Sequence, residues 1–343
     1  MTSGADDEFE ESKSEEFGPA EATLRCSIGR QMLLEGKFRQ GLAAMEARHA
    51  LPTRSSIDRH LPVWRGEHLT GQTLVIEAEQ GFGDSIQFVR FAGAVKQRGA
   101  RVVVRCPEPL LPLMAACQGV DAVASYASED EIPEASYRIP MMSLPFVLGT
   151  TPDDLAPGLS YCAPRLDLIN AWRKRLGKFV GAKVGLLWRG NPLNHEDAVR
   201  SPGLGPFLGL ASVPGVAWFS LQKGPGVEEL VTWPATTPVV DLGSELDDTT
   251  GAFEETAALL MALDLVITCD TAVAHLAGAV GRRAWVLLAA TPDWRWGLSG
   301  ERCDWYSALR LFRQPRAGAW EDAAADLKAA LAKFASAVNN NRR

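Results

Sequence analysis

Residues 264–288 constrain the fold most strongly, because they read as a buried strand, a tight turn, a helix and a second strand. Leu265–Cys269 is short, apolar and rich in β-branched side chains, which is typical of a parallel strand buried on both faces. Gly281 ends the helix, and Ala284–Leu288 predicts the next strand. Such a βαβ unit indicates an α/β fold, in which ligands bind at the carboxyl ends of the strands.

The start of this helix has the chemistry of an anion site. Asp270 and Thr271 are residues that begin helices, and the free N–H groups of a helix N-terminus suit a phosphate. His275 follows Thr271 by four residues, so both side chains project from one helix face and are candidates to hold a diphosphate. The alternative is a plain core unit, in which Asp270 is a helix cap and His275 a satisfied, half-buried histidine.

A chain of 343 residues is long enough for about two domains. Two α/β blocks are separated by a stretch with several prolines and glycines at 149–165, which predicts a linker and a cleft between the blocks. The domain prediction is a disordered acidic tail, a helical hairpin, an N-terminal and a C-terminal Rossmann-like domain, and a C-terminal helix with its tail, at residues 1–17, 18–55, 56–160, 161–318 and 319–343.

Composition excludes several classes of protein. Residues 1–17 carry seven acidic side chains and one lysine, so nearly all of the net charge of −7 lies there and the remainder is close to neutral. A neutral body argues against a nucleic-acid binder. No apolar run is long enough for a membrane span. The six scattered cysteines form no CxxC pair, which predicts reduced core residues, a cytoplasmic protein and no zinc site.

The first α/β block carries a glycine-rich turn after its first predicted strand. Gly81 and Gly83 let backbone approach a ligand closely, and Asp84 stands at the entrance of the following helix. The spacing is not GxGxxG, so a nicotinamide oxidoreductase is disfavoured. A carboxylate facing the cleft suits a general base that takes a proton from a hydroxyl nucleophile. The alternative is that Asp84 only caps the helix.

Other strand ends add candidates for the cleft. Lys223 follows a strand and precedes a glycine, where a cation can pair with a leaving diphosphate; the alternative is a solvated loop lysine. Arg189 and Asn191 occupy the same kind of position, and Arg200 in the following loop is a weaker candidate. Trp294 belongs to an aromatic and basic run that either walls the cleft or packs under the C-terminal helix.

Residues 20–50 have apolar side chains at helical spacing on either side of Gly36, which predicts a helical hairpin similar to one tetratricopeptide repeat. One such repeat does not make a core alone, so it must dock on the next domain or on a partner. A homodimer is one way to cover its free face.

Several ordered motifs resemble a known family. The block from about residue 60 to 315 resembles the C-terminal glycosyltransferase-like region of bacterial tetratricopeptide-repeat proteins, which is similar to the heptosyltransferases of glycosyltransferase family nine. The motifs that carry the resemblance are AEQGFGDSIQF, GLLWRGNP, SLQKG, DTAVAHLAG and PDWRW, at residues 78–88, 185–192, 220–224, 270–278 and 292–296. Gln87, in the first motif, is a further cleft candidate.

The resemblance implies a GT-B architecture and metal-independent, inverting transfer from a nucleotide-diphosphate sugar, with no cofactor. The acceptor hydroxyl would belong to a protein, a glycan or a lipid saccharide. Asp84 matches the catalytic base, Lys223 a phosphate-contacting lysine, and the phosphate-binding helix start is matched by Thr271, Ala272 and His275.

One loop departs from the family pattern. A sequence of the type Asn-Asp-x-x-Arg-Ser is replaced by HEDAVRS, from His195 to Ser201. A non-catalytic binding or scaffold protein on a degenerate GT-B frame is therefore the alternative function. The sequence does not identify the sugar, the nucleotide or the acceptor.

Overall fold

The structure, a computed structural model, describes residues 18–51, 61–127, 132, 135–155, 160–194, 196–248 and 251–342. The predicted acidic tail at 1–17 and His195 lie outside these residues. The predicted α/β fold with parallel sheets is confirmed, since every strand pairing within the two sheets is parallel. Within the described part of the chain, no helix combines the length and hydropathy needed to cross a membrane.

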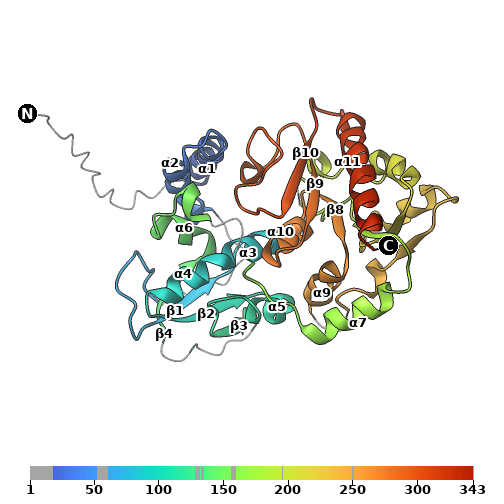
Figure 1. The fold of residues 1–343 in the computed structure, drawn as a ribbon. Coiled ribbons are helices and arrows are strands. Elements are labelled where there is room, and N and C mark those ends of the chain that lie inside the picture. Colours follow the sequence, from blue (N-terminus) through green and yellow to red (C-terminus); the bar gives the residue numbers. More distant parts are fainter. Residues whose placement is uncertain are drawn as a thin grey trace, which may run out of the picture.

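An N-terminal helical hairpin and a first lobe occupy the first half of the chain (Figure 1). The hairpin helices are α1 (Pro19–Leu34) and α2 (Phe38–Met45). The strands of the first lobe are β1 (Thr73–Glu77), β2 (Arg101–Cys106), β3 (Ala122–Ser125) and β4 (Ala135–Pro140). Its helices are α3 (Phe82–Phe88), α4 (Ala92–Gln97), α5 (Leu111–Ala115) and α6 (Leu144–Val147).

The second lobe contains a larger sheet. Its strands are β5 (Ala182–Leu186), β6 (Val216–Ser220), β7 (Val239–Asp241), β8 (Leu265–Cys269), β9 (Ala284–Leu288) and β10 (Leu309–Arg313). Its helices are α7 (Leu166–Leu176), α8 (Asp197–Arg200), α9 (Glu254–Ala262), α10 (Ala272–Ala279) and α11 (Trp320–Asn340).

The order of strands places one topological switch point in each sheet. The first sheet has the order β3-β2-β1-β4, and the second has the order β10-β9-β8-β5-β6-β7. In the second sheet the chain moves outward from β5 through β6 to β7, then returns to the other side of β5 and starts again at β8. Ligands of open α/β sheets bind outside the carboxyl ends of strands at such a reversal. The loops after β5 and β8 are therefore the expected place for a site.

Several elements were missing from the sequence prediction. Helix α7 lies directly after the predicted linker, and β10 lies within the stretch rich in Trp and Arg. Strand β10 has Arg310 and Arg313 beside apolar residues, so its composition hides the strand pattern. Helix α3 begins at Phe82, before Asp84, and the Asp84 carboxylate accepts a hydrogen bond from the Gly81 N–H at 2.9 Å, which caps the helix.

The hairpin is fixed to the first lobe by a buried polar cluster, which we call the hairpin anchor (Glu46, Arg48, Glu79 and Ser143). The Arg48 guanidinium donates to both carboxylate oxygens of Glu79 at 2.9 and 2.8 Å, and to Ser143 Oγ at 2.8 Å. It also donates to Glu46 at 2.6 Å. Glu79 follows β1 and Ser143 follows β4, so the anchor sits at the switch point of the first sheet. The tetratricopeptide-like character of the hairpin stays a prediction.

The hairpin also touches the second lobe. The ring of Phe38 lies 6.1 Å from that of Trp305, and Arg30 forms an ion pair with Glu196 at 3.5 Å. A helix pair that contacts both lobes braces their relative position.

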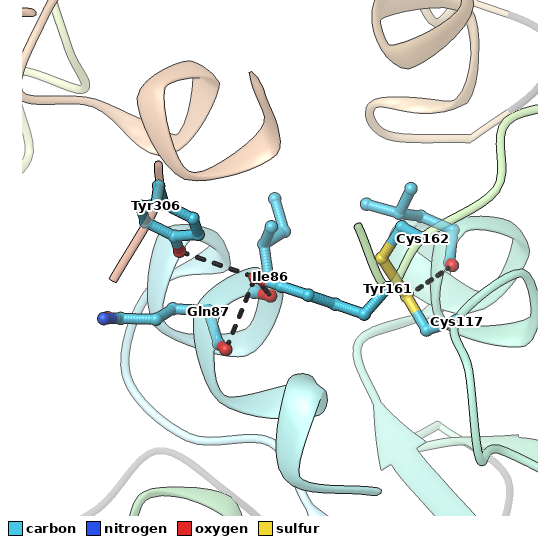
Figure 2. Close-up of a disulfide and its surroundings, with 7 residues drawn as sticks. Ile86, Gln87, Cys117, Tyr161, Cys162 and Tyr306 are labelled. Carbon is cyan, nitrogen blue, oxygen red and sulfur yellow. Dashed lines mark hydrogen bonds between the residues drawn. A yellow bond between two sulfur atoms is a disulfide. The ribbon is translucent and has the colours of Figure 1, made fainter. Parts of the chain in front are cut away.

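A disulfide between Cys117 and Cys162 joins the linker between the lobes to the end of α5 in the first lobe (Figure 2). The linker carries Tyr161, whose hydroxyl donates to the carbonyl of Ile86 on α3 at 3.0 Å, while its N–H donates to the Ala279 carbonyl at the end of α10 at 2.9 Å. The prediction of six reduced cysteines is therefore wrong for this pair. The sequence did not predict this bond, because the two cysteines are 45 positions apart and only the fold brings Cys162 back to the end of α5.

The hairpin anchor predicts a large loss of stability in Arg48→Ala. The substitution leaves Glu79 buried without its cation, and breaking one partner of a buried pair costs about 3–5 kcal/mol. Urea unfolding followed by circular dichroism measures the change. Arg25→Ala is the matched control on the same hairpin, because Arg25 pairs with Glu21 at the surface and such a pair contributes about 0.5 kcal/mol. Equal losses in both variants would contradict a structural role for the anchor.

Candidate functional site

A cavity of about 1430 Å³ lies between the two lobes, at the carboxyl ends of β5 and β8. It is the switch point expected from the topology. All but two of the residues predicted for the site line this cavity: Gly81, Gly83, Asp84, Arg189, Asn191, Arg200, Lys223, Asp270, Thr271, Ala272 and His275.

The N-terminus of α10 forms one wall. Thr271 precedes the helix in an extended conformation, and Ala272 and Val273 begin it beside the cavity. The first N–H groups of a helix have no intrahelical acceptor, so they are available to an anion. Thr271 Oγ1 lies 3.1 Å from Thr268 Oγ1, which fixes the turn after β8. The wall presents hydrogen-bond donors and the positive end of a helix dipole.

His275 is held as a neutral imidazole. Its Nδ1 lies 3.1 Å from the Tyr306 hydroxyl, and its ring stacks on Trp296 at 5.1 Å. Burial, and then the positive charge of Arg295, lower the pKa of His275 to about 3. When Tyr306 donates to Nδ1, the proton of the neutral ring sits on Nε2, which becomes a donor. Gly278 allows this packing, since a Cβ there would lie 2.1 Å from the Tyr306 ring.

Helix α3 of the first lobe meets α10 directly (Figure 1). A Cβ on Gly83 would lie 3.1 Å from Cδ2 of His275, so any other residue here would crowd the contact between α3 and α10. Asp84 lies one residue further, with 20% of its side chain exposed. Burial raises the pKa of Asp84 above its ordinary value, while Arg295 and the Gly81 N–H pull it down.

Arg295 is the principal site residue that the sequence prediction missed. It comes from the second lobe, lines the cavity, and forms an ion pair with Asp84 across the interface. Its guanidinium also donates to Asp293 at 2.9 Å. The sequence signal was its place after β9 in the Asp-Trp-Arg-Trp run, where a buried arginine needs buried acids as partners.

The remaining predicted cations reach the cavity but have acidic partners. Lys223 donates to the Leu246 carbonyl and to Asp248 at 2.5 Å. Arg189 pairs with Glu229. Arg200 lies 3.7 Å from Asp197. A phosphate at these positions would compete with the acids for the cations.

Gln222, a second residue missed by the prediction, supports the loop after β5. Its buried side-chain oxygen accepts hydrogen bonds from the N–H groups of Trp188 and Arg189 at 3.2 and 3.0 Å. Asn191, in the same loop, accepts from the Leu193 N–H at 3.0 Å. Gln222 therefore lines the cavity and also fixes the backbone of the loop after β5.

Two predicted cleft residues do not line the cavity. Trp294 is buried against Phe88 and Trp305, with ring centroids 6.5 and 5.7 Å away, so the packing alternative holds for it. Gln87 is fully buried and accepts from Arg295 Nε at 2.5 Å. Trp294 is excluded because Asp293 and Arg295 are the residues of the 293–296 turn that face the cavity. Gln87 is excluded because its side chain is buried under Arg295, to which its oxygen is bonded.

Backbone strain gathers around the cavity. Gln80, Asp247 and Phe253 are the non-glycine residues with left-handed φ among the described residues, and all three line it. Such conformations cost about 1–3 kcal/mol each and cluster at functional sites. Phe253 of the second lobe meets Phe82 of the first edge-to-face at 6.0 Å. In the described ranges, no group of three or more His, Cys, Asp or Glu side chains is arranged to hold a metal ion.

Comparison with known proteins gives the following relations. Residues 250–316, which contain α10, match glycosyltransferase family 9 (heptosyltransferase). The chain is 30% identical over 333 residues to Protein FlbA of Caulobacter vibrioides, an alignment that covers 89% of this chain and 54% of FlbA. The chain thus spans about half the length of that relative.

Two solved structures are similar in fold. A family 9 glycosyl transferase from Veillonella parvula has a TM-score of 0.54 at 11% identity, covering 73% of this chain and 88% of that one. An ADP-heptose LPS heptosyltransferase II from E. coli has a TM-score of 0.52 at 13% identity, covering 76% and 99%. The fold is the GT-B-like α/β fold of these proteins.

Asp270 and His275 are both buried beside the cavity, and they predict opposing pH dependences of stability. Unfolded histidine binds a proton near pH 6.5 but His275 only near 3, so its contribution is lost as pH falls through this window. Burial, then repulsion by Asp293, raises the pKa of Asp270 to about 6, so Asp270 gains stability as pH falls from 6 to 4.

His275→Gln removes the first contribution and leaves the second. Between pH 6 and 4 the free energy of unfolding of the variant should change relative to that of the wild type by about 1.4 kcal/mol per pH unit, in favour of the variant as the pH falls. Urea unfolding across this range measures the difference. His68→Gln, at an exposed position, should follow the wild-type curve. Parallel curves for wild type and His275→Gln would contradict a buried neutral His275.

Proposed function

We propose that the protein is a glycosyltransferase that moves a sugar from a nucleotide-diphosphate sugar to an acceptor hydroxyl, with inversion and without a metal ion. One observation supports it most: the N-terminus of α10 and the carboxylate of Asp84 face one cavity from opposite lobes. The first supplies donors for a departing anion and the second can accept a proton. In this proposal residues 56–160 form the acceptor domain and 161–318 the donor domain.

The donor's diphosphate would bind at the N-terminus of α10. Charge grows on the phosphate oxygen as the bond to the anomeric carbon breaks, and preorganised N–H groups stabilise that charge without reorganisation. His275 adds a neutral donor through Nε2, and its low pKa keeps it neutral at physiological pH. Lys223 and Arg200 supply positive charge at the cavity wall. These groups perform the part that a divalent cation performs in metal-dependent transferases.

The acceptor would approach from the first lobe. Asp84 takes the proton of the acceptor hydroxyl while the oxygen attacks the anomeric carbon on the face opposite the diphosphate. The new C–O bond forms as the bond to the diphosphate breaks, and its electron pair leaves with the phosphate. In-line displacement of this kind inverts the anomeric centre. The raised pKa of Asp84 favours proton uptake in the transition state.

One comparison narrows the range of candidate donor sugars. The E. coli protein of similar fold uses ADP-heptose, as its name states, so ADP-linked sugars come first among the candidates. The acceptor, a protein or a saccharide of a glycan or lipid, and the cytoplasmic location stay predictions.

Calorimetric titration of purified protein with ADP, UDP, GDP and CMP, in the presence of EDTA, should show saturable binding of one nucleoside diphosphate. His275→Ala should weaken it about tenfold, because one hydrogen bond to the phosphate contributes about 1.5 kcal/mol. His68→Ala is the matched control. If the protein is folded but binds none of the nucleotides or nucleotide sugars, the non-catalytic scaffold would be favoured.

Asp84→Asn should separate transfer from donor binding. The amide keeps the size of the carboxylate but accepts no proton, so kcat should fall about 10²–10⁴-fold while the donor Kd changes little. Transfer of a labelled sugar, with and without EDTA, measures the rate, and Asp326→Asn on the surface of α11 is the control. Equal loss of donor affinity and rate would contradict a base. An EDTA-sensitive wild-type rate would contradict metal independence.

A further inference from the structure

We propose that Arg295 is a positioning residue for the transfer reaction: it crosses from the second lobe to hold the Asp84 carboxylate, so that the base is complete only when the lobes are docked. The inference rests on the proposed function and assigns a role to a residue outside the helix α10 site.

The guanidinium of Arg295 has three acceptors on two lobes. On the first lobe Nη2 pairs with Asp84 Oδ1 and Nε donates to Gln87 Oε1 at 2.5 Å. On its own lobe Nη1 donates to Asp293 Oδ1 at 2.9 Å. Asp84 and Gln87 lie on the same face of α3, one turn apart, so the planar fork of an arginine fits both. A lysine ammonium has no such fork.

Arg295 itself is held rigidly. Its backbone N–H donates to Asp293 Oδ1 at 3.0 Å, which caps the short turn at 294–296. The guanidinium lies over the rings of Trp294 and Phe88, at 4.6 and 5.5 Å from their centroids. Its side chain is 9% exposed. A buried arginine stacked between rings from both lobes loses its position if the lobes separate.

The contact fixes both oxygens of the Asp84 carboxylate. Oδ1 is held by Arg295 and Oδ2 by the Gly81 N–H, so the plane of the carboxylate is set while each oxygen keeps a lone pair. A carboxylate held in this way keeps one orientation toward a hydroxyl that binds beside it.

Arg295 also offsets the negative charges that surround Asp84. Asp293 and Glu79 are carboxylates close enough to raise the pKa of Asp84, in addition to its burial, and Asp270 with neutral His275 face it across the cavity. Arg295 is the cation in contact with it. Removal of that cation would leave Asp84 protonated over a wider pH range, and a protonated carboxyl cannot act as a base.

Kinetics of Arg295→Gln and Arg295→Lys test the proposal, with Arg310→Gln as control because Arg310 pairs with Glu301 at the surface. In Arg295→Gln, kcat should fall about 100-fold at pH 7, the donor Kd should change less than about threefold, and the acid limb of the kcat profile should move to higher pH. Arg295→Lys should keep the acid limb near its wild-type position but lose rate, because it keeps the charge without the fork.

Two kinetic outcomes would overturn the proposal. A raised donor Kd with unchanged kcat would make Arg295 a donor-binding residue. In Arg295→Gln, a lower kcat with an unmoved acid limb would make Arg295 a structural residue.

A double-mutant cycle separates this proposal from the proposed function. Melting temperatures of Asp84→Asn, Arg295→Gln and the double variant should be non-additive, because each single change leaves a partner unpaired. The cycle needs no donor or acceptor. Wild-type protein that transfers no sugar while the cycle is non-additive would reject the function, and with it the positioning role, but not the contact. If the changes in melting temperature of the two single variants add up to that of the double variant, the contact itself would be rejected.

Discussion

The ion pair between Arg295 and Asp84 is the interaction on which the arrangement of the cavity depends. It joins the two lobes where α3 and α10 meet, at the edge of the cavity. Two charges withdrawn from water are costly unless their remaining hydrogen-bonding groups are satisfied. Here Asp293 and Gln87 satisfy the guanidinium, and the Gly81 N–H satisfies the carboxylate. The hydrogen bonds around the two charges therefore compensate for their burial at the interface between the lobes.

Other parts of the fold hold the lobes in the position that this pair needs. Tyr161 in the linker binds α3 through its hydroxyl and the end of α10 through its N–H, and the neighbouring disulfide ties the linker to α5 (Figure 2). The hairpin contacts both lobes, through Arg48 on one side and Phe38 on the other. Since Glu79, the partner of Arg48, lies five residues before Asp84, the hairpin also supports the loop that carries the proposed base.

Local pattern was enough to predict the parts of the molecule that are determined locally. Strands β8 and β9 have the predicted bounds, because a continuous apolar run between turn residues has few other conformations in a parallel sheet. The cavity at the switch point also followed from the order of strands and loops. Placement of Thr271 and Asp84 beside it needed only the rule that loops after parallel strands gather at one edge.

Contacts between side chains far apart in the chain could not be predicted from the sequence. Nothing near Lys223 indicates that Asp248 will occupy its ammonium, and nothing near Asp84 indicates Arg295, which lies more than 200 positions later. The same holds for Cys117 and Cys162. Trp294 was misplaced because an aromatic run does not reveal which member of a single turn faces the cavity. These errors concern which side chains meet, a matter decided by packing between lobes.

The most direct test of the account is a crystal structure of the protein with the nucleoside diphosphate that it binds. The account predicts phosphate oxygens within about 3 Å of the N–H groups of Ala272 and Val273 and of His275 Nε2, with Asp84 on the opposite side of the cavity. A nucleotide bound elsewhere, with the N-terminus of α10 free of phosphate, would contradict it.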